Sequence, residues 1–438
     1  MGLPSVNISF KEAGITAIKR GQRGMVVMIL NQEAGDGVCT VTLDTNNTGV
    51  INTDNLTVDA SVFKTQVSND GDTDFIYVAA NTSWQVAGAD VSLATYGIAL
   101  ADTPVDGDKF TVNYKSVREQ ALYELTATTD IEDSMGLTDK QKEYVTMAFM
   151  GYINPPKRVY LAMRASDASD YTDVEELLES FRWDYLTIPE IQAGECTAVA
   201  TWLKSTGKRS KAVLPNCAFD SERVINFTST GMITNDGIEY TTEEYCARIA
   251  GAIAGTPLDI ACTYANMSDL ADFTRIRTSA MDAAIDNGEL ILYNDGEKVK
   301  IARGVNSLIT TVQGKGDSFK KIKIVDAIDL IYDDIKKTCE DSYLGKYANS
   351  YDNKCLLLSA INGYFDTLEL DGILNKEYDN HAEIDVERQR AYLKGIGVNV
   401  NDMTDNEIKK YDTKDKVFLL ANIKILDAIE DINLDITI

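Results

Sequence analysis

Apolar and polar side chains alternate without interruption over the last seven residues of the chain, 432–438. A strand has a side-chain period of two, so the apolar positions share one face; they are Ile432, Leu434, Ile436 and Ile438. Near the other terminus the same alternation gives an apolar face made of Val6, Ile8 and Phe10. A lone strand has unpaired backbone groups and needs a sheet edge to receive it. The patterns therefore predict terminal strands that either close the chain on itself or are donated to neighbouring copies.

A long section of the chain alternates between strand-like and helix-like patterns. Residues 25–30 are almost wholly apolar, which is typical of a strand buried on both faces of a parallel sheet. Helices are expected at 138–151, 172–181, 193–206, 241–254 and 268–287, and apolar strand-like runs at 159–163, 185–188, 211–214 and 290–293. This alternation predicts a mostly parallel sheet with helices on both faces. The turn Asn294-Asp295-Gly296 predicts a closing hairpin between 290–293 and 299–302.

Residues 36–118 have a different composition from the segments on either side. They are rich in Thr, Asn, Asp, Gly and Val, and they contain short alternating runs such as 39–43 and 75–78. Turn signals occur at 69–71 and 106–108. The segment is therefore predicted to be an inserted all-β module, with its last strand at 109–114.

Beyond Arg303 the pattern predicts a second α/β unit. It would contain a strand at 322–325, a long helix at about 327–343, a second helix at 353–368, a strand at 417–425 and a helical turn at 426–431. Four acidic residues would then lie near the start of the long helix, where the helix dipole favours negative charge; they are Asp326, Asp329, Asp333 and Asp334.

These patterns divide the chain into five parts. The expected division is an N-terminal strand arm at 1–22, an α/β core at 23–35 and 119–300, the inserted β module at 36–118, a C-terminal domain at 301–426 and a C-terminal strand arm at 427–438. The segments beside the two terminal strands, at 13–23 and 426–431, are expected to act as hinges.

Charge and hydropathy narrow the possible classes of function. The 438 residues include 42 Lys and Arg against 68 Asp and Glu, for a net charge of −26, which weighs against general binding to nucleic acid or to an anionic membrane. The N-terminus lacks the apolar core of a secretion signal, and no apolar run reaches membrane-spanning length, so a soluble protein is expected. The seven cysteines form an odd set without CxxC spacing, which favours buried free thiols in a reducing cytoplasm.

Motifs for catalysis or cofactor binding are largely missing from the sequence. The chain has one histidine, His381, so any Ser-His-Asp triad would have to use it, and there is no GxSxG elbow. The glycine pairs at 35–37, 314–316 and 395–397 lack the rest of a dinucleotide or phosphate-binding fingerprint. Residues 44–49 match the first half of a calcium-binding EF-hand loop, but Asn55 replaces the glutamate at position twelve. We therefore expect no catalytic residue, no metal and no cofactor.

Several motifs in the second half of the chain resemble a known family. The segment 300–374 is similar to the C-terminal domain of contractile tail sheath proteins, which occur in contractile-tailed phages, PBSX-like defective prophages and R-type bacteriocins such as diffocins. The resemblance rests on the runs 301–308, 319–329, 343–350 and 360–365. The motif positions that carry it include Arg303, Gly304, Asn306, Gly345, Lys346 and Asn349. The N-terminal runs 2–10 and 23–28 are also similar to the arm and first core strand of the family.

The resemblance implies a structural role for the chain and no enzymatic activity. It implies a subtilisin-like α/β core without the protease triad, a second α/β domain that faces an inner tube, and terminal arms that pair with neighbouring copies. The implied partners are further copies of the chain in a helical sheath, an inner tube protein, and baseplate and tail terminator proteins. The sheath would assemble in the bacterial cytoplasm and become part of a released phage tail or bacteriocin particle, where it would contract to drive the tube through a target envelope.

Two other classes of function are compatible with the residues alone. A hydrolase on the same α/β scaffold would have to use His381, and a surface-layer or adhesin-like protein is suggested by the Thr/Asn-rich β module, although no export signal is present. For a sheath, we expect the extended array to be metastable, so that contraction releases energy stored during assembly. The acidic helix at about 326–341 is a candidate contact with the tube.

Overall fold

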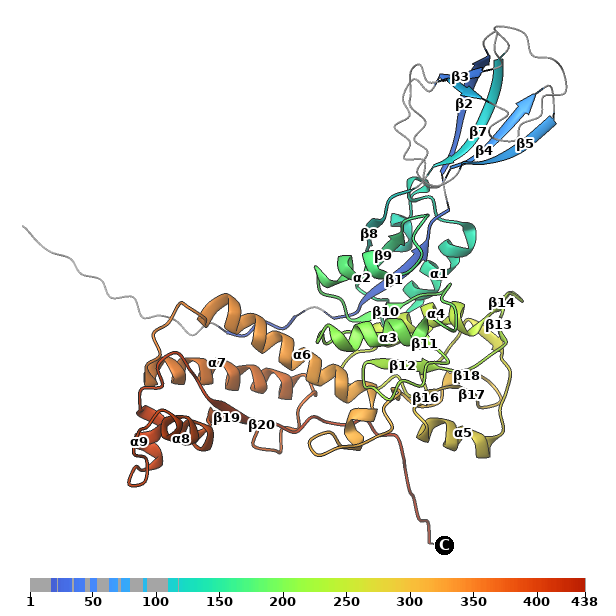
Figure 1. Cartoon of the computed structure of the whole chain (residues 1–438). Coiled ribbons are helices and arrows are strands. Elements are labelled where there is room, and N and C mark those ends of the chain that lie inside the picture. Colours follow the sequence, from blue (N-terminus) through green and yellow to red (C-terminus); the bar gives the residue numbers. More distant parts are fainter. Residues whose placement is uncertain are drawn as a thin grey trace, which may run out of the picture.

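A seven-stranded sheet forms the centre of the computed structural model (Figure 1). The structure describes residues 17–21, 23–33 and 118–437, together with the backbone of six strands between residues 35 and 116. The strand order is β16-β12-β11-β10-β1-β9-β8. Every neighbouring pair is parallel except β8 with β9. The strands are β1 (Met25–Asn31), β8 (Ala121–Leu125), β9 (Arg158–Arg164), β10 (Tyr185–Thr187), β11 (Lys211–Pro215), β12 (Val224–Phe227) and β16 (Glu289–Leu290).

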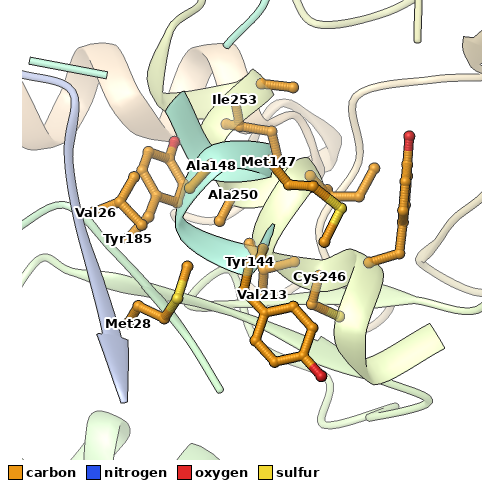
Figure 2. Packing of buried hydrophobic residues seen from close by; sticks show 14 of the residues in the cluster. Val26, Met28, Tyr144, Met147, Ala148, Tyr185, Val213, Cys246, Ala250 and Ile253 are labelled. Carbon is orange, nitrogen blue, oxygen red and sulfur yellow. The ribbon is translucent and has the colours of Figure 1, made fainter. Parts of the chain in front are cut away.

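Helices cover both faces of this sheet, as its apolar strands predict. On one face, α1 (Asp139–Met150) and α4 (Thr242–Ala254) pack on Val26 and Met28 of β1 (Figure 2). On the other face, α2 (Thr172–Glu179) and α3 (Cys196–Ser205) pack around the intervening residues Val27 and Ile29. The prediction of 25–30 as a strand buried on both faces of a parallel sheet is confirmed.

Smaller elements complete this part of the chain. The predicted hairpin is confirmed as β17 (Leu292–Asn294) paired with β18 (Val299–Ile301). The single helix expected at 268–287 is wrong, because its first part contains β15 (Leu270–Asp272) and only Thr278–Asp286 forms α5. β15 joins β13 (Met232–Thr234) and β14 (Glu239–Tyr240) in a three-stranded sheet, and this pairing overrides the local helical pattern.

A second, wholly antiparallel sheet lies between β1 and β8 in the sequence. Its strand order is β5-β4-β7-β2-β3-β6. The strands are β2 (Gly35–Leu43), β3 (Thr48–Asn52), β4 (Phe63–Asn69), β5 (Asp72–Val78), β6 (Asp90–Ser92) and β7 (Lys109–Ser116). The first four residues of the loop compared with an EF-hand, 44–47, lie outside the described residues.

The C-terminal part is built mainly from helices. They are α6 (Ile322–Thr338), followed by a π-helical turn at Cys339–Tyr343, then α7 (Tyr351–Leu370), α8 (Val386–Gly395) and α9 (Asp405–Lys410). β19 (His381–Ile384) pairs with β20 (Leu419–Asn422) in an antiparallel two-stranded sheet. The predicted strand at 322–325 is wrong, since these residues form the first turn of α6. A four-residue run of three apolar side chains and one lysine fits a buried helix as well as a strand. Ile322, Val325 and Leu330 all lie buried along α6.

Candidate assembly surfaces

The C-terminal arm leaves the body of the molecule as an extended segment (Figure 1). Its apolar positions face solvent: Ile432, Leu434 and Ile436 are 80%, 76% and 75% exposed. Ile438 and the three apolar positions of the N-terminal pattern, Val6, Ile8 and Phe10, lie outside the described residues. No described residue hydrogen bonds to the arm beyond Asp431, so its pairing within an assembly stays a prediction.

A polar anchor fixes the arm just before it leaves the body. Glu430 has a side chain only 6% exposed, and it accepts a hydrogen bond of 2.6 Å from the Thr263 hydroxyl and lies 3.0 Å from the Lys321 ammonium. Arg303 contacts Asp431 at 2.6 Å, and Lys321 contacts Asp427 at 2.5 Å. These contacts join the arm to the segment after β18 and to the N-terminus of α6.

The backbone just before this anchor is also held in place. Leu426 donates its N–H to the Ile373 carbonyl at 2.9 Å, and its own carbonyl accepts a bond of 2.5 Å from the Lys323 ammonium. The helical turn expected at 426–431 is wrong, because these residues form no helix and the side chains of Asp427, Glu430 and Asp431 bind the body. A hinge for the arm would therefore begin after Asp431.

The N-terminal segment is fastened to the middle of the same helix. Ile18 is buried in the cluster between α6 and α7, and the Gly21 N–H donates to Asp334 at 2.9 Å. Arg23 lies 3.3 Å from Asp333 and 2.8 Å from Asp184. Helix α6 thus anchors both terminal segments of the chain. The C-terminal segment is held at the first turn of α6, and the N-terminal segment is held farther along the helix.

Two buried ion pairs hold α6 against the amino ends of the parallel strands. Asp329, with no exposed side-chain surface, lies 2.5 Å from Lys211 at the start of β11 and 2.6 Å from Arg223 just before β12. Burial alone would raise the pKa of Asp329, but the charges of Lys211 and Arg223 and their hydrogen bonds outweigh it and lower that pKa below its usual value. Asp326 contacts the same Lys211 at 2.7 Å and accepts a hydrogen bond from the Tyr185 hydroxyl.

This arrangement corrects one expectation for the acidic residues of α6. Asp329, Asp333 and Asp334 lie beyond the first turn of the helix, so the dipole argument does not explain them. Their carboxylates bind groups of the same chain. The contact between the acidic helix and an inner tube stays a prediction. The local sequence does not identify Lys211 and Arg223 as partners of Asp329. The signal that it does contain is a cation at the edge of an apolar strand.

The motif residues fall into two groups at different places. Arg303 and Gly304 lie at the arm anchor, where the Gly304 N–H donates to the Thr263 hydroxyl at 3.0 Å and a Cβ at Gly304 would lie 2.7 Å from the Cys262 sulfur. Asn306 follows them and donates to the Phe319 carbonyl at 2.8 Å. The first group therefore builds the support for the C-terminal arm.

The second motif group lies in the connection between α6 and α7. Gly345 has a φ of +73°, which favours glycine, and Lys346 donates to the Asp341 carbonyl. The Asn349 amide donates to the Thr413 hydroxyl and to the carbonyls of Lys414 and Lys416, so it fixes the loop that leads into β20. The structure thus gives this second group a role in shaping the C-terminal part.

The β19–β20 sheet has one closed and one open edge. On the outer side of β19, the Asn362 side chain accepts from the Ala382 N–H at 2.7 Å and donates to the Ala382 carbonyl at 3.3 Å. Ala421 stands opposite Ala382, and in an antiparallel ladder both residues of such a pair turn their backbone groups outward. The N–H and C=O of Ala421 therefore face away from β19, and no described residue hydrogen bonds to them. β20 is an open edge.

Groups that could carry other functions are placed as follows. His381, the residue that a hydrolase would have to use, begins β19. Its Nδ1 contacts only Asp379, at 3.1 Å from the carbonyl oxygen and 3.3 Å from the carboxylate. Four of the described cysteines are buried free thiols, namely Cys196, Cys217, Cys246 and Cys262. Within the described residues, no group of three or more His, Cys, Asp or Glu side chains could hold a metal ion, and no helix is long and apolar enough to cross a membrane.

Comparison with known proteins identifies the family. Residues 164–307 match the model of the phage tail sheath protein central domain, and residues 314–438 match that of the phage tail sheath C-terminal domain. A tail sheath protein of Clostridium phage phiCD119 is 38% identical over 320 residues, which cover 71% of this chain and 88% of that protein.

Solved structures share the fold at low sequence identity. A sheath tail protein from Desulfitobacterium hafniense matches with a TM-score of 0.51 and 18% identity, over 87% of this chain and 94% of that one. The contracted sheath complex of an extracellular contractile injection system matches with a TM-score of 0.53 and 14% identity, over 73% of this chain and 87% of that one. The sequence matches confirm the family that the motifs predict: the chain belongs to the phage tail sheath proteins and is a structural sheath subunit.

Proposed function

We propose that this subunit polymerises helically around an inner tube by donating its terminal strands, 6–10 and 432–438, to neighbouring copies. The observation that carries the proposal is the C-terminal arm, which is fixed to the body as far as Asp431 and then presents an exposed apolar face that no described residue covers. An exposed, regularly alternating strand is unfavourable in water unless a sheet edge receives it. The arm therefore has the properties of a connector.

The open edge of β20 is the acceptor that we propose for a donated strand. Ala421 offers an unpaired backbone donor and acceptor there, while Asn362 closes the opposite edge of the same sheet. A contact between the arm of one copy and β20 of the next joins two different surfaces. Such a heterologous contact does not close on itself unless its rotation completes a ring, so it generates a helical array.

We also propose the finer division of the chain that its patterns predict. The parts are the arm at 1–22, a subtilisin-like core at 23–35 and 119–300, the β module at 36–118, the sheath domain at 301–426 and the arm at 427–438. The parallel sheet with helices on both faces supports the core, and the antiparallel sheet supports the module. In this scheme the two anchors on α6 move with the rigid body, and contraction changes the course of the chain outside them.

The proposed partners and location follow from the same scheme. The sheath would contact the inner tube protein, the baseplate and a tail terminator. It would assemble in the bacterial cytoplasm and be released as part of a particle. The extended array would store the energy that contraction releases when it drives the tube through a target envelope.

Deletion of residues 432–438 tests the proposal. We expect the shortened chain to keep the circular dichroism spectrum and melting temperature of the full chain, because no described residue packs on the deleted segment. It should not form cylinders in negative-stain electron micrographs. Replacement of Asn433, Asp435 and Thr437 by serine is the matched control, since it retains the apolar face and should retain assembly. Cylinders formed by the shortened chain would contradict the proposal.

A further inference from the structure

A cavity of about 430 Å³ lies at the carboxyl ends of β11, β12 and β16, on the edge of the central sheet opposite to α6. Its lining includes Asn216 just after β11, residues 228–230 just after β12, and Ile291 just after β16. Ligands of open α/β sheets bind beyond the carboxyl ends of the strands, and the volume is within the range of small-molecule sites. None of the anchor contacts of the two arms involves these residues.

The wall of the cavity contains a buried amide without a hydrogen-bond partner. Asn226 lies on β12 and is 2% exposed, and its Oδ1 atom is buried and unpaired. An unpaired buried amide destabilises a fold, and an apolar side chain would fill the same place without that cost. Because the amide turns about its last side-chain bond, it can offer either its oxygen or its nitrogen to a molecule in the cavity.

A carboxylate lies beside this amide. Among the described residues that line the cavity, Glu289 alone is charged. It is the register partner of Asn226 on the neighbouring strand β16, so the two side chains point to the same side of the sheet. The Oε2 atom of Glu289 accepts a hydrogen bond of 3.0 Å from the Thr228 hydroxyl, and no described cation lies within 4.0 Å of the carboxylate. The cavity therefore has a net negative charge.

Much of the remaining wall is apolar. Phe273, Ile291 and Leu292 are buried, and Ile276 is 41% exposed. Such a wall suits an aliphatic chain that ends in a cation, because the chain would cover apolar side chains while the cation pairs with Glu289. An anion would be repelled, and a neutral molecule would leave the carboxylate without a counter-charge.

We propose that this cavity binds a small organic cation, namely an ammonium or guanidinium group on a short aliphatic chain. Its N–H groups donate to the free oxygen of Glu289 and to the amide oxygen of Asn226. Two sources share this chemistry: a free amine or guanidine in solution, and a Lys or Arg side chain of a second copy of the chain. The proposal goes beyond the strand contact and does not depend on it.

Titration of the full chain with butylamine and butylguanidine, followed by isothermal titration calorimetry, tests the proposal. Both probes are cations at neutral pH, and 1-butanol and butyrate are the neutral and anionic controls of similar shape. We expect saturable binding of the two cations only. Glu289→Gln retains the shape of the side chain and should weaken this binding roughly tenfold, because it removes a charge-assisted hydrogen bond. Glu297→Gln removes an exposed carboxylate outside the cavity and is the matched control.

Asn226→Leu separates binding from folding. The change replaces an unpaired buried amide by an apolar side chain of similar volume, so the melting temperature should stay the same or rise. Binding of butylamine should fall roughly tenfold, because one acceptor is lost. A lower melting temperature with unchanged binding would mean that Asn226 serves only the fold, and the proposal would then be wrong.

Assembly into cylinders distinguishes the two sources of the cation. If a second copy supplies it, Glu289→Gln and an excess of butylamine should each raise the protein concentration needed for assembly, relative to Glu297→Gln and to an equal excess of sodium chloride. If the cation is a free molecule, assembly should be unchanged while binding persists. Absence of saturable binding, or equal binding of 1-butanol, would overturn the proposal whether or not the arms donate strands.

Discussion

Lys211 at the start of β11 and Asp329 in the middle of α6 form an ion pair of 2.5 Å in which neither side chain is more than 1% exposed. They are 118 residues apart in the sequence. The pair joins the first residue of β11, in the core sheet, to α6, the helix that anchors both terminal segments of the chain. The position of the arms thus depends on a contact buried between the two halves of the molecule.

Removal of the Asp329 carboxylate should be strongly destabilising. Asp329→Ala leaves the buried cations of Lys211 and Arg223 with less compensation, and breaking a buried pair in this way costs about 3–5 kcal/mol of unfolding free energy. Lys211→Met should cost less, because Arg223 still neutralises Asp329. Urea unfolding followed by circular dichroism measures both, with Arg275→Ala as an exposed control. Equal stability of Asp329→Ala and the unchanged chain would contradict the role of this pair.

The same carboxylate predicts how stability depends on pH. The pKa of Asp329 is lowered in the folded chain, so its contribution is fully present above the unfolded value of about 4 and is lost as pH falls below it. Asp334 has the opposite sign, because burial raises its pKa. The difference in unfolding free energy between the unchanged chain and Asp329→Asn should therefore shrink between pH 5 and pH 2. A constant difference over that range would show that the charge of Asp329 is not what stabilises the contact.

Gly304 is expected to tolerate no side chain while Cys262 is present. A Cβ at this position would lie 2.7 Å from the buried Cys262 sulfur, and overpacking of this kind costs about 1–3 kcal/mol. Gly304→Ala should lower the melting temperature, and Cys262→Ala in the same chain should recover part of the loss because it removes the colliding atom. The double-mutant cycle measures the coupling between the two sites. Additive losses would mean that the two residues do not collide.

Sequence patterns predict the strands and helices of the core better than those of the C-terminal part. Residues 25–30 were predictable because a continuous apolar run bounded by a glycine has few alternatives in a parallel sheet. The run 322–325 is also mostly apolar, but it contains Lys323 and forms the first turn of α6, where Ile322 packs in the core cluster. Short apolar runs do not distinguish a buried strand from a buried helix.

The anchors of the arms could not be predicted from local patterns. Arg303 was recognised only as part of a motif, and its contact with Asp431 joins residues 128 positions apart. The local sequence predicts only a helix-dipole interaction for Asp329, because nothing near it in the sequence points to Lys211. By contrast, the exposed apolar face at Ile432, Leu434 and Ile436 followed directly from their spacing, since alternation alone determines which side chains share a face.

The open edge of β20 allows a substitution that removes one outward hydrogen bond and leaves the internal ladder intact. Ala421→Pro deletes the N–H that faces away from β19, and proline is tolerated on edge strands when its missing donor faces solvent. We expect the variant to fold with a melting temperature close to that of the unchanged chain and to lose cylinders in electron micrographs. Ala421→Ser keeps the donor and should assemble normally, whereas Leu420→Pro breaks the ladder with Glu383 and should unfold the C-terminal sheet. If Ala421→Pro assembles as well as Ala421→Ser, the donated strand binds at a different edge, because no other acceptor loses a hydrogen bond through this change.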